Sequence, residues 1–270
     1  MSRREIHIPD GHESGEPMTF AQRTMYDVVR FLLEVVCRVY FRLEVHGRRN
    51  IPRRGPFIIC PVHRSYLDTP VLGAATFRRM RYMGAEKMWT NRPLGWFLTS
   101  VGGFPVQRGS ADRAALDVAL TVVERGEPLV MFPEGTRQFG PTVHKLFDGP
   151  AYVACRTGVP VIPVGMGGTA AAMPKGSRMV RPSKMVVVIG EPIEPPPRKE
   201  SGRVSRSAVR DLTARLSDAI QDLFDEAQLR VGDPNVHVVP ADTAETAETA
   251  ETAGPDGEHD ATDGDRVAPD

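Results

Sequence analysis

One stretch decides the fold that we expect for this chain: Phe57-Ile58-Ile59-Cys60-Pro61-Val62-His63-Arg64-Ser65-Tyr66-Leu67-Asp68. Its first half, residues 57–62, is continuously apolar, which indicates a buried strand. The apolar run then stops, and a His, an Arg, a Ser and an Asp follow within six residues. A buried strand that ends in polar side chains is typical of a functional site at the edge of a sheet.

His63 and Asp68 lie five residues apart, so on a straight helix they would be rotated by about 500° and face different sides. They can meet only where His63 lies in a strand-to-helix loop and Asp68 in the first helical turn. There, Asp68 would accept the proton of one ring nitrogen and leave the other free to take a proton from a hydroxyl. The alternatives are that Asp68 caps the following helix and that His63 fills a surface or capping position.

Apolar runs alternate with amphipathic stretches along the chain. The expected strands are residues 42–47, 57–62, 81–85, 129–132, 159–164 and 184–190, with a further short strand that ends at Arg108. The expected helices are residues 21–41, a short one from Pro70, and 93–100, 110–124, 150–157 and 203–230. This order predicts one α/β domain with a mostly parallel mixed sheet, covered by helices on both faces and preceded by an N-terminal amphipathic helix.

Two further polar clusters also follow expected strands. In such sheets, ligands bind beyond the carboxyl ends of the strands. Arginines suit bidentate contact with phosphate or carboxylate, threonine offers a hydroxyl, and glycine lets an anion approach the main chain. The candidates for an anion site beside His63 are therefore Arg108, Gly135, Thr136 and Arg137, and Glu134 stands in the same cluster. The alternative for Glu134 is a structural salt bridge with an arginine.

Charge is unevenly distributed along the 270 residues. The chain is formally neutral, but residues 232–270 hold 11 Asp and Glu and a single basic residue, Arg266. Residues 1–231 therefore carry 33 Lys and Arg against 23 Asp and Glu, a formal net charge of +10. A basic domain attracts anionic partners such as phosphate esters, acidic lipid or nucleic acid. We expect a flexible lead-in over residues 1–20, one domain over 21–231, and a disordered acidic tail over 232–270.

The stretch Met25–Phe41 is the nearest approach to a membrane-spanning helix. Charged residues interrupt it at spacings of three or four, so we expect an amphipathic helix, packed on the domain or lying in a membrane interface. No stretch reaches 18 uncharged apolar residues. The first twenty residues lack the apolar segment of a signal peptide.

Several chemistries find no support in the sequence. Cys37, Cys60 and Cys155 are widely spaced in apolar surroundings, as expected of buried reduced thiols in a cytosolic protein. No Cys/His spacing suits zinc, so no metal site is predicted. Phosphate-loop, dinucleotide-binding and serine-nucleophile motifs are absent from the sequence. No aromatic and basic motif supports a nucleic-acid partner.

Four blocks of sequence resemble those of the glycerolipid acyltransferases, and most closely the bacterial 1-acyl-glycerol-3-phosphate acyltransferases. His63-Arg64-Ser65-Tyr66-Leu67-Asp68 resembles their H-x-x-x-x-D motif, and Phe132-Pro133-Glu134-Gly135-Thr136-Arg137 their F-P-E-G-T-R motif. Residues 103–108 are similar to the family's second block and residues 159–164 to its fourth. The blocks stand in family order and span residues 57–190.

The resemblance implies transfer of a fatty acyl group from acyl-CoA or acyl carrier protein to the free hydroxyl of 1-acyl-glycerol-3-phosphate, giving phosphatidate for phospholipid biosynthesis. His63 would be the general base and Asp68 its orienting partner. The phosphate of the acceptor would be bound by Arg108, Glu134, Gly135, Thr136 and Arg137. No cofactor is implied besides the acyl donor. A lipid acceptor implies a peripheral or monotopic enzyme at the cytoplasmic face of the cell membrane.

Two departures from the family pattern bear on the acceptor. Val62 precedes His63 where many members have Asn, and Gln138 follows Arg137 where Ser is frequent. Neither change removes a catalytic group. The alternatives are an acyltransferase that acts on glycerol 3-phosphate or another lysolipid, and a non-catalytic module that binds anionic lipid. The presence of both His63 and Asp68 speaks against the non-catalytic module.

Overall fold

The computed structural model describes residues 17–106, 113–174, 176–177, 179–197 and 204–237. Most of the lead-in, nearly all of the acidic tail and the predicted site residue Arg108 lie outside these residues. The described residues up to Asn235 belong to one compact unit.

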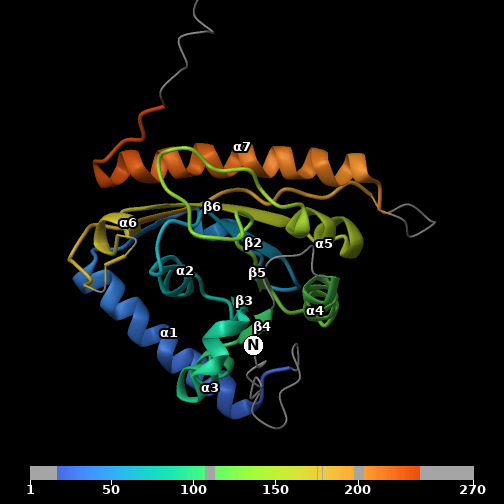
Figure 1. Cartoon of the computed structure of the whole chain (residues 1–270), viewed down its shortest axis with the longest axis horizontal. Coiled ribbons are helices and arrows are strands. Elements are labelled where there is room, and N and C mark those ends of the chain that lie inside the picture. The colour runs from blue at the N-terminus through green and yellow to red at the C-terminus, as the bar shows by residue number, and fades with distance from the viewer. Residues whose placement is uncertain (1–16, 107–112, 175, 178, 198–203, 238–270) are drawn as a thin grey trace, which may run out of the picture. The chain divides into compact units, whose positions relative to one another are not determined.

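A seven-stranded sheet forms the centre of this unit, in the order β1-β7-β6-β2-β5-β3-β4 (Figure 1). The strands are β1 (Glu44–His46), β2 (Ile58–Pro61), β3 (Arg81–Ala85), β4 (Gly103–Val106), β5 (Leu129–Val130), β6 (Val161–Gly167) and β7 (Val186–Ile189). All neighbouring strands are parallel except β6 and β7, which are antiparallel. This is the mostly parallel mixed sheet that the sequence predicts.

β2 lies in the middle of the sheet, between β6 and β5. Ile58 pairs with Val161 on one side and with Leu129 on the other. The side chains of residues 57–60 are all fully buried, which explains why this run is apolar without alternation. The strand therefore delivers the residues that follow it to the middle of the sheet edge.

Helices cover both faces of the sheet. They are α1 (Phe20–Tyr40), α2 (Asp68–Ala75), α3 (Arg92–Ser100), α4 (Arg113–Glu124), α5 (Gly149–Thr157), α6 (Thr169–Ala172) and α7 (Arg206–Val231), with short 3-10 turns at Arg48–Asn50 and Glu86–Thr90. In Figure 1, α7 lies along one face over β6 with α5 beside it, and α2 lies on the opposite face with α1 packed outside it.

α7 approaches β6 closely because glycines of β6 face it. A Cβ atom on Gly165 would lie 2.0 Å from the carbonyl oxygen of Leu223, and one on Gly167 would lie 2.5 Å from that of Ala227. We expected this strand to end at residue 164, but β6 continues through both glycines and pairs there with β7. The lack of side chains therefore does not end the strand here; it makes room for the helix.

α1 is the amphipathic helix that the sequence predicts. It begins at a capping box in which Thr19 and Gln22 bond each other's main-chain N–H. Its inner side buries Tyr26 and Cys37. Its other side leaves large apolar side chains exposed to solvent: Phe20, Val28, Phe31, Leu32, Val35, Val36 and Val39. Among the helices of the described residues, none combines the length and the apolarity that crossing a bilayer requires.

Candidate active site

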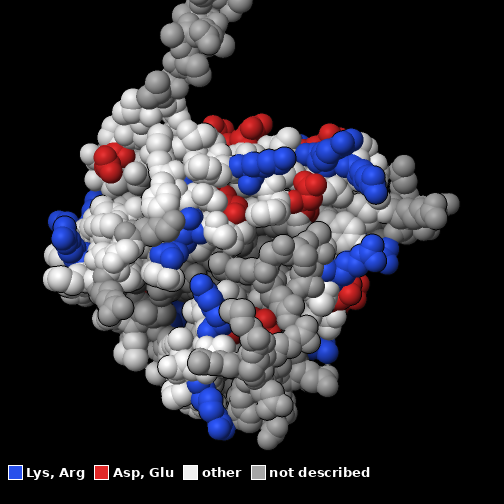
Figure 2. Space-filling model, in the orientation of Figure 1, with Lys and Arg blue, Asp and Glu red and all other residues white. Residues whose placement is uncertain are grey.

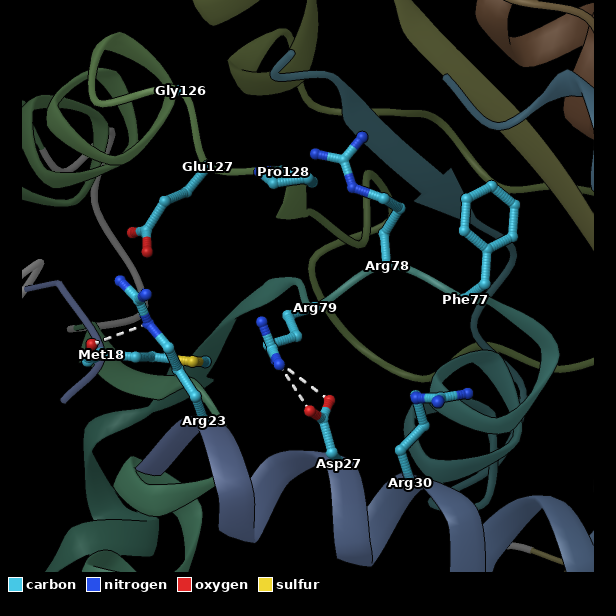
Figure 3. Close-up of a pocket in the computed structure, with 10 residues that line it drawn as sticks. All are labelled: Met18, Arg23, Asp27, Arg30, Phe77, Arg78, Arg79, Gly126, Glu127 and Pro128. Atoms are coloured by element: carbon cyan, nitrogen blue, oxygen red, sulfur yellow. Dashed lines mark hydrogen bonds and ion pairs between the residues drawn. The ribbon is translucent and has the colours of Figure 1, made fainter. Parts of the chain in front are cut away.

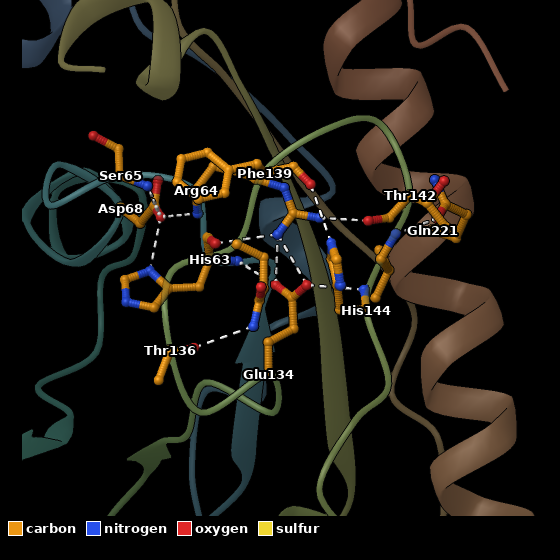
Figure 4. A network of polar contacts seen from close by, with 12 residues as sticks. His63, Arg64, Ser65, Asp68, Glu134, Thr136, Phe139, Thr142, His144 and Gln221 are labelled. Atoms are coloured by element: carbon orange, nitrogen blue, oxygen red, sulfur yellow. Dashed lines mark hydrogen bonds and ion pairs between the residues drawn. The ribbon is translucent and has the colours of Figure 1, made fainter. Parts of the chain in front are cut away.

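Two of the predicted polar clusters meet at the carboxyl edge of the sheet. His63 follows β2 and Glu134 follows β5, and these strands are parallel neighbours. The main-chain N–H of His63 donates to the carboxylate of Glu134 at 2.9 Å. The main-chain N–H of Gln138 donates to the carbonyl of His63, also at 2.9 Å. The two loops are thus joined in both directions (Figure 4).

The imidazole of His63 contacts the carboxylate of Asp68, with Nδ1 2.9 Å from Oδ2. The same oxygen accepts hydrogen bonds from the main-chain N–H groups of Arg64 at 2.6 Å and Ser65 at 2.7 Å. Asp68 is fully buried at the start of α2. Its carboxylate therefore turns back onto the loop instead of capping the helix ahead of it.

This contact sets the tautomer of His63. An ionised carboxylate can only accept, so the proton shared with Asp68 belongs to Nδ1, and Nε2 carries the lone pair. The ring of Phe132 packs against the imidazole, with centroids 4.1 Å apart and planes at 32°. The ring of His63 is thus held both at one nitrogen and across one face. The geometry is that of a base whose second nitrogen is available to a hydroxyl.

Glu134 is buried beneath the loop of His63 and bonded to protein groups alone. Arg64 Nη1 donates to both of its carboxylate oxygens, at 2.9 and 2.7 Å. The main-chain N–H of His144 donates to Oε1 at 3.0 Å, and that of His63 donates to Oε2. The salt bridge with an arginine, which the sequence left as an alternative, is present, and Arg64 is the partner. Any effect of Glu134 on an acceptor would therefore act through the loops that it joins.

Arg64 was not among the candidate residues, although it stands next to His63. It is only 5% exposed, and besides Glu134 it bonds the carbonyl groups of His63 at 3.1 Å and Thr142 at 3.0 Å. Phe224 of α7 lies under its guanidinium, 4.9 Å from ring centroid to Cζ. The only sequence signal for this role is a charged residue directly after a buried strand.

The other members of the Glu134–Arg137 cluster lie nearer the surface. Gly135 has a positive φ of 69°, and a Cβ atom there would come within 2.7 Å of the ring of Phe147. Thr136 is exposed and accepts a hydrogen bond from the side chain of Gln138 at 3.1 Å. The guanidinium of Arg137 stacks on the ring of Tyr66, 3.4 Å from its centroid. Within the described residues, Arg137 forms no ion pair, so its charge is available to an anionic ligand.

One buried thiol lies close to His63 in the chain, but it is not suited to act as a nucleophile. Cys60 lies in β2 and is fully buried in the core. Burial raises the pKa of its thiol, because the charged form is desolvated there. A thiolate nucleophile at Cys60 is therefore strongly disfavoured. Within the described part of the chain, no three His, Cys, Asp or Glu side chains come together as metal ligands would.

A cavity of about 580 Å³ lies at the opposite edge of the sheet (Figure 3). It is lined by α1 and by the segments that lead into β3 and β5, so it faces the amino ends of these strands. Its arginines are held at separate points by carboxylate or main-chain oxygens of the protein: Arg23, Arg30, Arg78 and Arg79. They do not converge in Figure 3, and we assign this cavity no part in the chemistry.

Comparisons with known proteins relate this chain to acyltransferases. The model of the Acyltransferase family matches residues 42–167. Over 170 residues the chain is 25% identical to the 1-acyl-sn-glycerol-3-phosphate acyltransferase of Bacillus subtilis (strain 168), which covers 63% of this chain and 82% of that protein. Over 140 residues it is 30% identical to the lyso-ornithine lipid O-acyltransferase of Pseudomonas aeruginosa, covering 51% of this chain and 52% of that protein. The chain spans about half the length of the plant and algal relatives that it matches.

A solved structure shows the same fold. The crystal structure of the 1-acyl-sn-glycerophosphate acyltransferase PlsC from Thermotoga maritima superposes with a TM-score of 0.58 and 24% sequence identity, covering 76% of this chain and 83% of that one. The mixed sheet, the ordered sequence blocks and the matched family model point the same way. Over residues 42–167 the chain is similar to the Acyltransferase family, and this similarity and the curated relatives indicate acyl transfer as its activity.

Proposed function

We propose that this acyltransferase moves a fatty acyl group from acyl-CoA or acyl carrier protein to the free hydroxyl of 1-acyl-glycerol-3-phosphate, giving phosphatidate. The observation that carries the proposal is the contact between His63 and the buried Asp68. It leaves one imidazole nitrogen free at the sheet edge. Arg137, in the neighbouring loop after β5, forms no ion pair with a carboxylate of the described residues. The name of the Bacillus relative supports this acceptor.

The reaction needs one base and no acylated side chain. His63 Nε2 takes the proton of the acceptor hydroxyl while the hydroxyl oxygen attacks the carbonyl carbon of the thioester. Asp68 stabilises the imidazolium that forms. The tetrahedral intermediate then collapses: the C–S bond breaks, and the imidazolium returns its proton to the leaving thiolate. The products are the new ester and the free thiol of the carrier.

Arg137 is the residue that would bind the phosphate of the acceptor. A guanidinium suits bidentate contact with phosphate oxygens. Its stacking on Tyr66 fixes the plane of the guanidinium without using any of its N–H donors. Gly135 and Thr136 would add main-chain and hydroxyl donors, and Arg108 a second cation. Glu134 would act indirectly: it accepts the hydrogen bond of the main-chain N–H of His63 and so keeps that residue in place.

A second candidate acceptor is another lysolipid. The Pseudomonas relative is named for lyso-ornithine lipid and shares 30% identity. Such an acceptor offers no phosphate monoester to Arg137, whereas lysophosphatidate does. We therefore favour the phosphorylated acceptor, and a panel of lysophosphatidate, glycerol 3-phosphate and lyso-ornithine lipid separates the candidates.

The exposed apolar side of α1 is where we propose that the enzyme meets the cytoplasmic surface of the membrane. Burying each large aliphatic or aromatic side chain in lipid contributes roughly 1.5–3 kcal/mol. Trp96 of α3, a helix that packs against α1, is 55% exposed, and tryptophan favours the membrane interface. Figure 2 shows Lys and Arg dispersed over the face in view, with Asp and Glu between them over α7. The proposed docking therefore rests on the exposed apolar side chains of α1.

His63→Ala tests the proposed base. With lysophosphatidate and a long-chain acyl-CoA, we expect the release of free CoA to fall by about 10²–10⁴-fold, because the hydroxyl loses its proton acceptor. Thiol release is measured with a chromogenic reagent, and phosphatidate by mass spectrometry. His46→Ala on β1 is the matched control and should keep wild-type turnover. Near-normal turnover of His63→Ala would show that another group is the base.

Tyr66→Leu tests the support of Arg137. Loss of the ring should raise the KM for lysophosphatidate roughly two- to thirty-fold, since a cation–π contact contributes about 0.5–2 kcal/mol. The measurement is the initial rate against acceptor concentration. Tyr66→Phe keeps the ring and should keep the wild-type KM. A KM that is equal in all three proteins would show that Arg137 needs no such support.

Phe31→Glu and Leu32→Glu together test membrane docking through α1. Binding to vesicles of phosphatidylglycerol and phosphatidylethanolamine should weaken on the order of tenfold or more, because both side chains lose their burial in lipid. Binding is measured by co-sedimentation. Leu229→Glu alters an equally exposed apolar residue of α7, and it should leave binding unchanged. Equal weakening in both proteins would contradict docking through α1.

A further inference from the structure

One side chain of α7, Gln221, reaches the loop beside the candidate active site. Its Oε1 accepts a hydrogen bond from the main-chain N–H of Val143 at 2.6 Å. Its Nε2 donates to the carbonyl of Pro141 at 3.1 Å and to Oδ1 of Asp225 at 2.9 Å. These three partners fix the orientation of the carboxamide, because a reversed amide would set its NH₂ against another N–H. Gln221 thus forms hydrogen bonds with the loop on both sides of Thr142.

The peptide group between Thr142 and Val143 is shared by two partners. Its N–H donates to Gln221, and its C=O accepts from Arg64 Nη2 at 3.0 Å. A trans peptide points these two groups in opposite directions, so this one bridges α7 on one side and Arg64 on the other. Hydrogen bonds at both ends of a peptide group polarise it and strengthen each other. The hydrogen bond between Arg64 and the carbonyl of Thr142 therefore depends on the hydrogen bond that Gln221 forms with the same peptide group.

From Arg64 the contacts continue to the proposed base. Arg64 pairs with Glu134, and Glu134 accepts the main-chain N–H of His63. The same loop adds a second tie, because the N–H of His144 donates to the other oxygen of Glu134. Arg64 and Glu134 are at least 95% buried. A shift of the loop would thus be passed to His63 through bonds that water cannot easily replace.

We propose that Gln221 is a positioning residue for acyl transfer. It touches no reacting atom; it holds the 142–143 peptide so that Arg64 and Glu134 keep His63 aligned with Asp68 and the acceptor hydroxyl. This role rests on His63 being the base, as proposed for the reaction. α7 lies outside residues 42–167, which the family model matches. None of the sequence blocks that suggested the function contains Gln221.

The test compares two glutamines of α7 in the full-length protein. Gln228 also accepts one main-chain N–H, that of Gly168 at 3.1 Å, but it has no contact with the 139–145 loop among the hydrogen bonds of the described residues. Gln221→Leu should lower kcat by about 10–100-fold, the effect of a small misplacement of the base. The KM for lysophosphatidate should change less than about threefold, because Arg137 is untouched. Gln228→Leu should keep the wild-type kcat.

A wild-type kcat in Gln221→Leu, or equal losses of kcat in both variants, would overturn the proposal. If Gln221→Leu does not fold, Gln221→Asn replaces it with the same expectations, since it keeps the carboxamide but is one methylene too short. Amide hydrogen exchange separates this role from the reaction itself. Exchange at His63 and His144 should be faster in the Gln221 variant, and unchanged exchange would contradict the positioning role. Absence of acyl transfer by the wild-type protein would contradict only the proposed function.

Discussion

The buried ion pair between Arg64 and Glu134 is the interaction on which the candidate site depends. Both charges are removed from water, at a cost that mutual attraction offsets only where the remaining donors and acceptors are also bonded. Glu134 meets this requirement with the N–H groups of His63 and His144. Arg64 meets it in part: its Nη atoms bond the carbonyls of His63 and Thr142, while its buried Nε has no partner among the described residues. The pair therefore fixes three segments at once: the loop after β2, the loop after β5, and the stretch around Thr142.

We propose that the site separates charges that position the base from charges that bind the acceptor. Arg64 and Glu134 are buried and pair with each other, and the two oxygens of Glu134 and both Nη atoms of Arg64 form hydrogen bonds with protein groups. Arg137 lies nearer the surface and stacks on a ring instead of pairing with an acid. In the proposed function, this charge attracts the anionic acceptor. The imidazole of His63 contacts Asp68 through Nδ1, and its Nε2 forms no hydrogen bond within the described residues.

Much of the fold was predictable because its signals are local. A fully buried central strand must be apolar throughout, and residues 57–62 show this directly. The contact between His63 and Asp68 was also predictable, since only five residues separate them and just one loop geometry brings them together. The role of His63 as the base stays a prediction.

The features of the fold and the site that could not be predicted depend on contacts between residues far apart in the chain. Arg64 and Glu134 are separated by 70 residues, and no periodicity shows that Glu134 points inward and not toward a ligand. Gln221 is polar on a half-buried helix, where a sequence alone suggests a solvated side chain. The antiparallel pairing of β7 was not readable either, because a buried strand has the same apolar pattern in either direction. Such features appear only once the sheet brings the loops together.

The tautomer of His63 tests most directly whether the site holds a base that Asp68 has prepared. It can be measured by nitrogen-15 NMR of the imidazole in the full-length protein near neutral pH. We predict a proton on Nδ1 and a pyridine-like Nε2, because a carboxylate at 2.9 Å can only accept. A proton on Nε2 and none on Nδ1 would contradict the assignment, since a protonated Nε2 could not take a proton from the acceptor hydroxyl.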